Sequence, residues 1–179
     1  VQLLSDTREP LAMTPGKAKR YDYEYKRQGT ANLFMMCQPL TGWREVKATE
    51  KRKKVDFAAC MQELVDVYFP HAEVIRVVLD NLNTHTPASL YEAFEPAEAR
   101  RLLRKLEFHF TPKHGSWLNM AEIEISILSR QCLKQRVSSL QQLDEVTTKW
   151  TLARNIQQAK IDWCFDVTQA RTKLARLYP

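Results

Sequence analysis

The chain has 179 residues, of which 44% are hydrophobic, and a formal net charge of +6 at pH 7. This length is enough for one sizeable hydrophobic core but short for two. No apolar run is long enough to cross a bilayer, and the N-terminus lacks the basic and then apolar layout of a signal peptide. We therefore expect residues 1–179 to form one soluble, cytoplasmic domain without a membrane partner.

Cysteine spacing and charge distribution narrow the class of protein further. The four cysteines show no CxxC or zinc-knuckle spacing, which favours buried small side chains over metal ligands. Residues 80–129 contain five basic and seven acidic residues, and residues 130–179 contain nine and four. Basic flanks beside an acidic middle suit a metal-dependent nuclease, because carboxylates bind cations and the flanks bind phosphates. An ordinary mixed surface explains the same charges equally well.

The first half of the chain alternates between turn signals and apolar runs. Residues 1–20 are expected to form an extended arm, because residues 6–20 are rich in Pro, Lys and Arg. A turn at Thr41-Gly42 between two short runs predicts an antiparallel hairpin of residues 32–38 and 43–48. Apolar residues at helical spacing predict a helix over residues 55–69, and the β-branched run 74–79 predicts a buried strand.

The second half is predicted to be mainly helical. Pro87 and Pro96 each favour the first turn of a helix, and residues 107–111 alternate as a short strand does. Asn119 is a good N-cap for a helix over residues 120–133. Residues 134–179 are expected to form a helical C-terminal part, with a helix capped by Ser138 or Ser139 and a last helix from Thr168 to near Tyr178. This order predicts an α/β fold in which helices flank both faces of a mixed sheet.

Asp80 is the first candidate for chemistry. It follows the predicted strand 74–79, and active sites in such sheets gather at the carboxyl ends of strands. The structural alternative is an aspartate that caps the next loop, a common role for Asp-Asn.

A second carboxylate and two histidines are further candidates. Glu122 lies in the first turn of the predicted helix, where the helix dipole stabilises a negative charge. Glu124 points to a different face, so only one of the two can line a given site, and we expect Glu124 to face solvent or a partner. His85 and His114 lack zinc-ligand spacing. Each either contacts a phosphate or the water at the bond to be cleaved, or has only a structural role.

Two segments together resemble a known family. Leu79–Asn81 with His85, followed by TPKHGSWLNMAE over residues 111–122, resembles the bacterial insertion-sequence transposases related to the mariner superfamily. That family's pattern is Asp-Asn, a nearby His, and later Pro, Ser and Leu-Asn-x-x-Glu. The resemblance covers essentially the whole chain and implies a ribonuclease H-like fold with a triad of two aspartates and one glutamate.

The resemblance also implies roles for individual residues. Asp80 is the second catalytic aspartate and Glu122 the glutamate, 42 residues further on, with Asn81, His85 and Asn119 in support. The family's first aspartate lies on the first, central strand of the sheet. That strand precedes the segment resembling residues 1–4, so we expect the chain to be truncated there.

The implied activity is metal-dependent cleavage and strand transfer of double-stranded DNA at transposon ends and target. Two Mg²⁺ or Mn²⁺ ions are expected in the complete domain. The protein is expected to be a homodimer. It is expected in the bacterial cytoplasm, associated with the nucleoid when bound to DNA. The alternatives are another ribonuclease H-like nuclease, such as a resolvase, or a non-catalytic remnant that binds DNA or a second protomer. Candidate phosphate contacts are Lys113, His114, Arg130, Lys134 and Arg136, with residues 51–54 as a second candidate.

Overall fold

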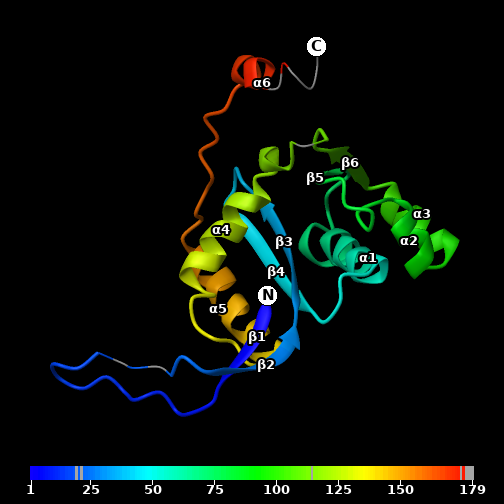
Figure 1. The fold of residues 1–179 in the computed structure, drawn as a ribbon. Helices are drawn as coiled ribbons and strands as arrows, with labels where there is room; N and C mark the ends of the chain where they lie inside the picture. The colour runs from blue at the N-terminus through cyan, green and yellow to red at the C-terminus, as the bar shows by residue number, and fades with distance from the viewer. Residues whose placement is uncertain (19, 21, 114, 174, 176–179) are drawn as a thin grey trace.

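A computed structural model describes the whole chain except residues 19, 21, 114, 174 and 176–179 (Figure 1). In chain order its elements are β1 (Gln2–Asp6), β2 (Tyr25–Thr30), β3 (Asn32–Gln38), β4 (Trp43–Thr49), α1 (Lys54–Glu63), the π-helical turn η1 (Leu64–Tyr68), β5 (Ile75–Leu79), α2 (Ala88–Ala93), α3 (Pro96–Leu103), β6 (Leu106–Phe110), the 3₁₀ turn η2 (Ser116–Leu118), α4 (Ala121–Gln131), α5 (Leu140–Ile156) and α6 (Val167–Lys173). Among the described helices, none is both long and apolar enough to span a bilayer.

The strands form three pairs. β1 with β2 and β3 with β4 are antiparallel, whereas β5 and β6 are parallel and joined through α2 and α3. The predicted α/β class and the predicted hairpin are therefore confirmed. Within the described residues the strands remain separate two-stranded sheets.

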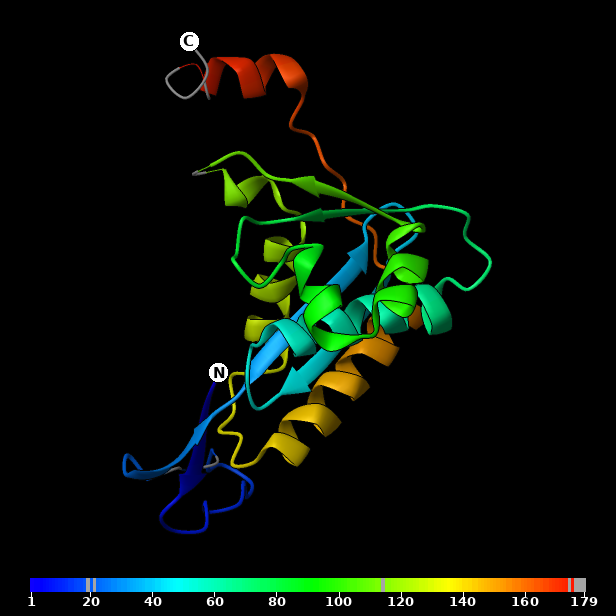
Figure 2. The same cartoon turned by 90° about the vertical axis from the view of Figure 1, so that its right-hand side faces the viewer.

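The β3–β4 hairpin is the middle layer of the fold. Along β3 the side chains alternate: Leu33 and Met35 pack with α4 and α5, and Phe34 and Met36 pack with α1. Figures 1 and 2 show α4 and α5 on one side of the hairpin and α1 to α3 on the other. Helices thus cover both faces, as the order of elements predicts.

The predicted helices agree with the structure in type and differ mainly at their ends. α1 and η1 together fill the predicted helix 55–69, with a π-type hydrogen bond from the Phe69 amide to the Leu64 carbonyl at 3.0 Å. Pro96 occupies the first turn of α3, and Ser139 Oγ caps α5 by accepting from the Gln142 amide at 3.1 Å. The predicted end of the last helix near Tyr178 lies outside the described residues.

β5 is less buried than its sequence predicts. Arg76 and Val78 are exposed, Val78 by 57%, while Ile75 and Val77 pack against the core of α1 and β6. The prediction of a fully buried strand is wrong because β5 has one strand neighbour, β6, and one covered face in the described part of the chain.

The predicted N-terminal arm is a long, irregular hairpin between β1 and β2. Isolated bridges join Leu11 to Arg20 and Thr14 to Lys17, and the arm projects away from the body in Figure 1. β1 itself is fastened to the body where the Leu4 amide donates to the Val137 carbonyl at 2.7 Å.

The segment after α5 crosses the β3–β4 turn, and we call residues 157–173 the C-terminal strap. Gly42 in that turn has φ +79°, and the Ile161 amide donates to the Pro39 carbonyl at 3.2 Å. A Cβ on Gly42 would lie 2.5 Å from the carbonyl carbon of Gln158, so the strap approaches as closely as a glycine allows.

Gly42→Ala is therefore expected to lower the free energy of unfolding. Gly16→Ala is the matched control, because Gly16 has φ +77° and open space where its Cβ would lie. Chemical denaturation should find Gly42→Ala less stable than Gly16→Ala by about 1–3 kcal/mol, the usual cost of overpacking. Equal losses in the two variants would show that backbone strain alone matters at Gly42.

Candidate functional site

The parallel pair β5 and β6 brings two segments that contain candidate site residues to one edge. Leu79 and Phe110 are register partners, and the Thr111 amide donates to the Leu79 carbonyl at 2.9 Å. Two residues after Leu79, Asn81 Nδ2 donates to the carbonyl of the same Thr111 at 2.6 Å. Asn81 thus fastens the loop that begins at Asp80 to the loop that leads from β6 toward η2.

Asp80 is held by its own loop. Its Oδ1 atom lies 2.7 Å from His85 Nδ1 and 3.3 Å from the Leu82 amide, both in hydrogen-bonding geometry. Oδ2 accepts no hydrogen bond from the described residues, and the side chain is 43% exposed. One carboxylate oxygen is therefore fixed and the other is free to bind a ligand.

His85 is itself fixed by aromatic packing. Its ring lies 4.9 Å from the ring of Phe57 on α1 and 6.4 Å from that of Phe34 on β3, between centroids. The imidazole is therefore anchored in the core on one side and bonded to Asp80 on the other. The structure places His85, predicted as a supporting residue, in direct contact with Asp80.

Glu122 lies in the first turn of α4 and points into solvent. Its side chain makes no hydrogen bond or ion pair with the described residues. Asn119, the predicted N-cap, accepts the Ala121 amide on Oδ1 at 3.1 Å, and its carbonyl accepts the Glu122 amide at 3.0 Å. The helix therefore begins one residue later than predicted, with Met120 at the N-cap position, and Asn119 supports its first turn from just outside.

Glu124 contradicts the expectation that it faces solvent or a partner. It is fully buried between two arginines: Oε2 lies 2.9 Å from Arg44 Nε, and Oε1 lies 3.0 Å from Arg154 Nη2. Arg44 is buried as well, and its Nη2 also donates to the Ala159 carbonyl of the strap. A carboxylate neutralised by two guanidinium groups is a structural ion pair and is poorly suited to bind a metal ion.

Burial makes two of the four cysteine thiols poor nucleophiles. Burial raises the pKa of Cys37 to about 11, with a further contribution from the Glu124 carboxylate, and burial raises that of Cys60 to about 12. Both thiols therefore stay protonated at neutral pH. Among the described residues, no group of three His, Cys, Asp or Glu side chains stands ready to hold a metal ion.

The predicted phosphate contacts fall into two groups. Lys113, Arg130 and Lys134 are exposed and form no ion pair with any described residue. His114 lies outside the described residues. In the second candidate stretch, Lys54 is ion-paired with Glu92, whereas residues 51–53 are exposed.

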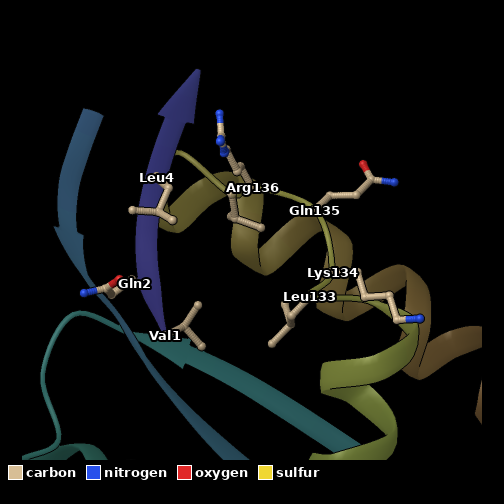
Figure 3. A pocket seen from close by; sticks show the side chains of 8 residues that line it. Val1, Gln2, Leu4, Leu133, Lys134, Gln135 and Arg136 are labelled. Carbon is tan, nitrogen blue, oxygen red and sulfur yellow. The ribbon is translucent and has the colours of Figure 1, made fainter. Parts of the chain in front are cut away.

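Arg136 has a structural position. Its guanidinium lies 2.6 Å from Asp6 Oδ1 and donates to the carbonyls of Asp22, Tyr23 and Glu24, so it fastens both strands of the arm to the body. A phosphate would have to compete with these four acceptors. Figure 3 shows Arg136 directed along β1 and Lys134 pointing away from it. Both residues line a hollow of about 250 Å³, and neither Asp80 nor Glu122 lines it.

A known protein family, described as the DDE superfamily endonuclease, matches residues 2–144 of the chain. The match includes Asp80, Glu122 and both loops described above. No curated protein and no solved structure matches the chain.

The two glutamates on α4 are expected to respond in opposite ways to truncation. Glu124→Ala leaves Arg44 and Arg154 without their carboxylate, so urea denaturation should show a loss of about 3–5 kcal/mol in the free energy of unfolding. Glu122→Ala removes an exposed side chain without partners and should change stability by less than about 0.5 kcal/mol. If Glu124→Ala were as stable as Glu122→Ala, the buried ion pairs would not stabilise this fold.

Proposed function

Because the chain belongs to the DDE superfamily of endonucleases, we propose that it is the catalytic domain of a DNA transposase. In this proposal it cleaves and transfers DNA strands at transposon ends, with Asp80 and Glu122 as two metal-binding carboxylates. The observation that carries the proposal is which oxygen atoms of these carboxylates are free to bind a ligand. One oxygen of Asp80 is hydrogen-bonded and the other is free, and both oxygens of Glu122 are free. The neighbouring Glu124, in contrast, is ion-paired with two arginines.

The donor set fits a hard divalent cation. Mg²⁺ prefers carboxylate and water oxygens and keeps several waters, so a partly exposed carboxylate with one free oxygen suits it. When bound, such ions polarise the phosphate and activate the attacking hydroxyl or water. Asp80 Oδ2 and the carboxylate of Glu122 would hold them.

The other residues of the site orient and bind. His85 holds Asp80 Oδ1, which prevents the carboxylate from rotating Oδ2 away, and Asn81 keeps the end of β5 fastened to the loop after β6. Lys113, Arg130 and Lys134 are free to contact DNA phosphates, with a salt dependence that follows from counterion release. No covalent protein–DNA intermediate is needed, since water or a DNA 3′-hydroxyl is the nucleophile.

A third carboxylate is needed because two hold a pair of metal ions poorly, and β3 offers a place for it. Among the described strands, β3 pairs only with β4 and β5 only with β6, so each has a second edge available. Val1 and Ala31 exchange backbone hydrogen bonds of 2.8 and 2.9 Å, so the pairing of β1 with β2 continues to the residue just before β3. We propose that the third carboxylate lies on a strand paired with the second edge of β3.

The test is cleavage of DNA that carries the ends of the encoding element, by the full-length protein. Asp80→Ala and Glu122→Ala should each lower the Mg²⁺-dependent cleavage rate at least about a hundredfold, because each removes a metal ligand. DNA affinity, measured by band shift, should stay near that of the unmodified protein.

Glu73→Ala is the control, since Glu73 is an exposed carboxylate without a partner among the described residues and outside both loops. It should cleave normally. Normal cleavage by Asp80→Ala or Glu122→Ala would refute the assignment of that residue. DNA binding without any cleavage by the unmodified protein would favour the alternative of a non-catalytic DNA-binding remnant.

A further inference from the structure

The C-terminal strap meets the loop that presents Glu122. The ring of Phe165 packs edge-on against that of Trp117 in η2, with centroids 5.1 Å apart at 72°, and Trp163 packs edge-on against Phe165 at 6.0 Å. Lys173, on α6, places its Nζ 4.7 Å from the centre of the Trp117 ring. We call Trp117, Trp163, Phe165 and Lys173 the aromatic clasp.

The loop that the clasp holds has little internal support. η2 is a single 3₁₀ turn of three residues, in which the Leu118 amide donates to the Gly115 carbonyl at 3.0 Å. Turns of this kind are short and have poor hydrogen-bond geometry, so tertiary contacts decide whether they persist. Trp117 is the middle residue of the turn, and Asn119, two positions later, accepts the Ala121 amide at the start of α4.

The strap also contacts Arg44, an ion-pair partner of Glu124, which follows Glu122 by two positions. Its Ala159 carbonyl accepts from Arg44 Nη2, the same guanidinium that pairs with Glu124. Arg44 is further tied to the end of α5, where its amide donates to Asn155 Oδ1 at 2.9 Å and its carbonyl accepts from Asn155 Nδ2 at 2.8 Å. In the sequence Glu122 therefore lies between two anchored residues, Trp117 and Glu124: the strap contacts Trp117 directly and contacts Glu124 through Arg44.

We propose that Phe165 is a positioning residue: through Trp117 it fixes η2 and the first turn of α4, and so fixes where Glu122 points. This inference deepens the proposed function and rests on it for the role of Glu122. The mechanical part does not rest on it, because the order of η2 and α4 can be measured without DNA or metal.

The first measurement is amide hydrogen exchange on the full-length protein. In Phe165→Ala, the amides of Leu118, Glu122 and Ile123 should exchange about two- to tenfold faster, as the loss of one edge-to-face aromatic contact predicts. Amides in the middle of α5 should keep their rates. Phe165→Leu, which keeps apolar volume but lacks the ring, should show the same local change, and Phe165→Tyr should exchange like the unmodified protein.

The matched control is Val167→Ala, which shortens another apolar side chain of the strap that is 67% exposed. It should leave all these rates unchanged. Unchanged exchange at Leu118, Glu122 and Ile123 in both Phe165→Ala and Phe165→Leu would overturn the proposal. So would an equal acceleration throughout α5, because Phe165 would then stabilise the fold as a whole.

The second measurement separates positioning from general stability. If Glu122 is misplaced, Phe165→Ala should need several-fold more Mg²⁺ for half-maximal cleavage, with unchanged DNA affinity. A lower DNA affinity with an unchanged Mg²⁺ requirement would contradict a positioning role. If Asp80→Ala and Glu122→Ala also cleave normally, the proposed function fails, while the exchange result still decides whether the clasp orders η2.

Discussion

The buried carboxylate of Glu124 is the interaction on which the candidate site depends. It joins three elements: Arg44 comes from β4, Glu124 from α4 and Arg154 from α5. Removing three charges from water is costly, and only their mutual attraction and hydrogen bonds compensate for it. The three elements therefore have to meet in one arrangement, which also fixes how α4 is rotated about its own axis.

That rotation determines which of the two glutamates on α4 is exposed to solvent. Residues two positions apart on a helix are separated by roughly 200° around its axis. Because Glu124 points inward to the arginines, Glu122 points outward, away from the packed face of α4. The ion pairs thus do indirectly what a direct contact to Glu122 could not do, since they orient it and leave both of its oxygens free.

Asp80 is oriented by a different device. Parallel pairing of β5 and β6 aligns the ends of the two strands, and Asn81 ties the segments that follow. His85, packed against Phe34 and Phe57, then holds one oxygen of Asp80. The hydrophobic core therefore orients Asp80 through His85, whereas the ion pairs of Glu124 with Arg44 and Arg154 orient Glu122 through the rotation of α4.

Local patterns in the sequence predict much of this fold. The β3–β4 hairpin, α1 and the helix starts at Pro96 and Ser139 follow from turn residues, helical spacing and caps, all of which act over a few positions. The burial of β5 was predicted wrongly because it depends on which strands and helices cover it, and its own β-branched residues do not reveal that.

The candidate site was predictable only in part, for a similar reason. Asp80, Glu122 and His85 stand out by motif, but the partners of Glu124 lie 80 and 30 residues away. One signal was present: Arg44 shares a face of β4 with Val46 and Ala48, and an inward-facing arginine among apolar residues requires a buried acid. The contact of Phe165 with Trp117 has no local signal.

The most direct test of Asp80 and Glu122 as metal ligands is where a metal ion binds in the full-length protein. Crystals grown with Mn²⁺ should show anomalous density within about 2.0–2.2 Å of both Asp80 Oδ2 and a Glu122 carboxylate oxygen, or of one of them for each of two neighbouring ions. Mn²⁺ held instead by Glu124, or by a cluster that includes neither Asp80 nor Glu122, would contradict the account.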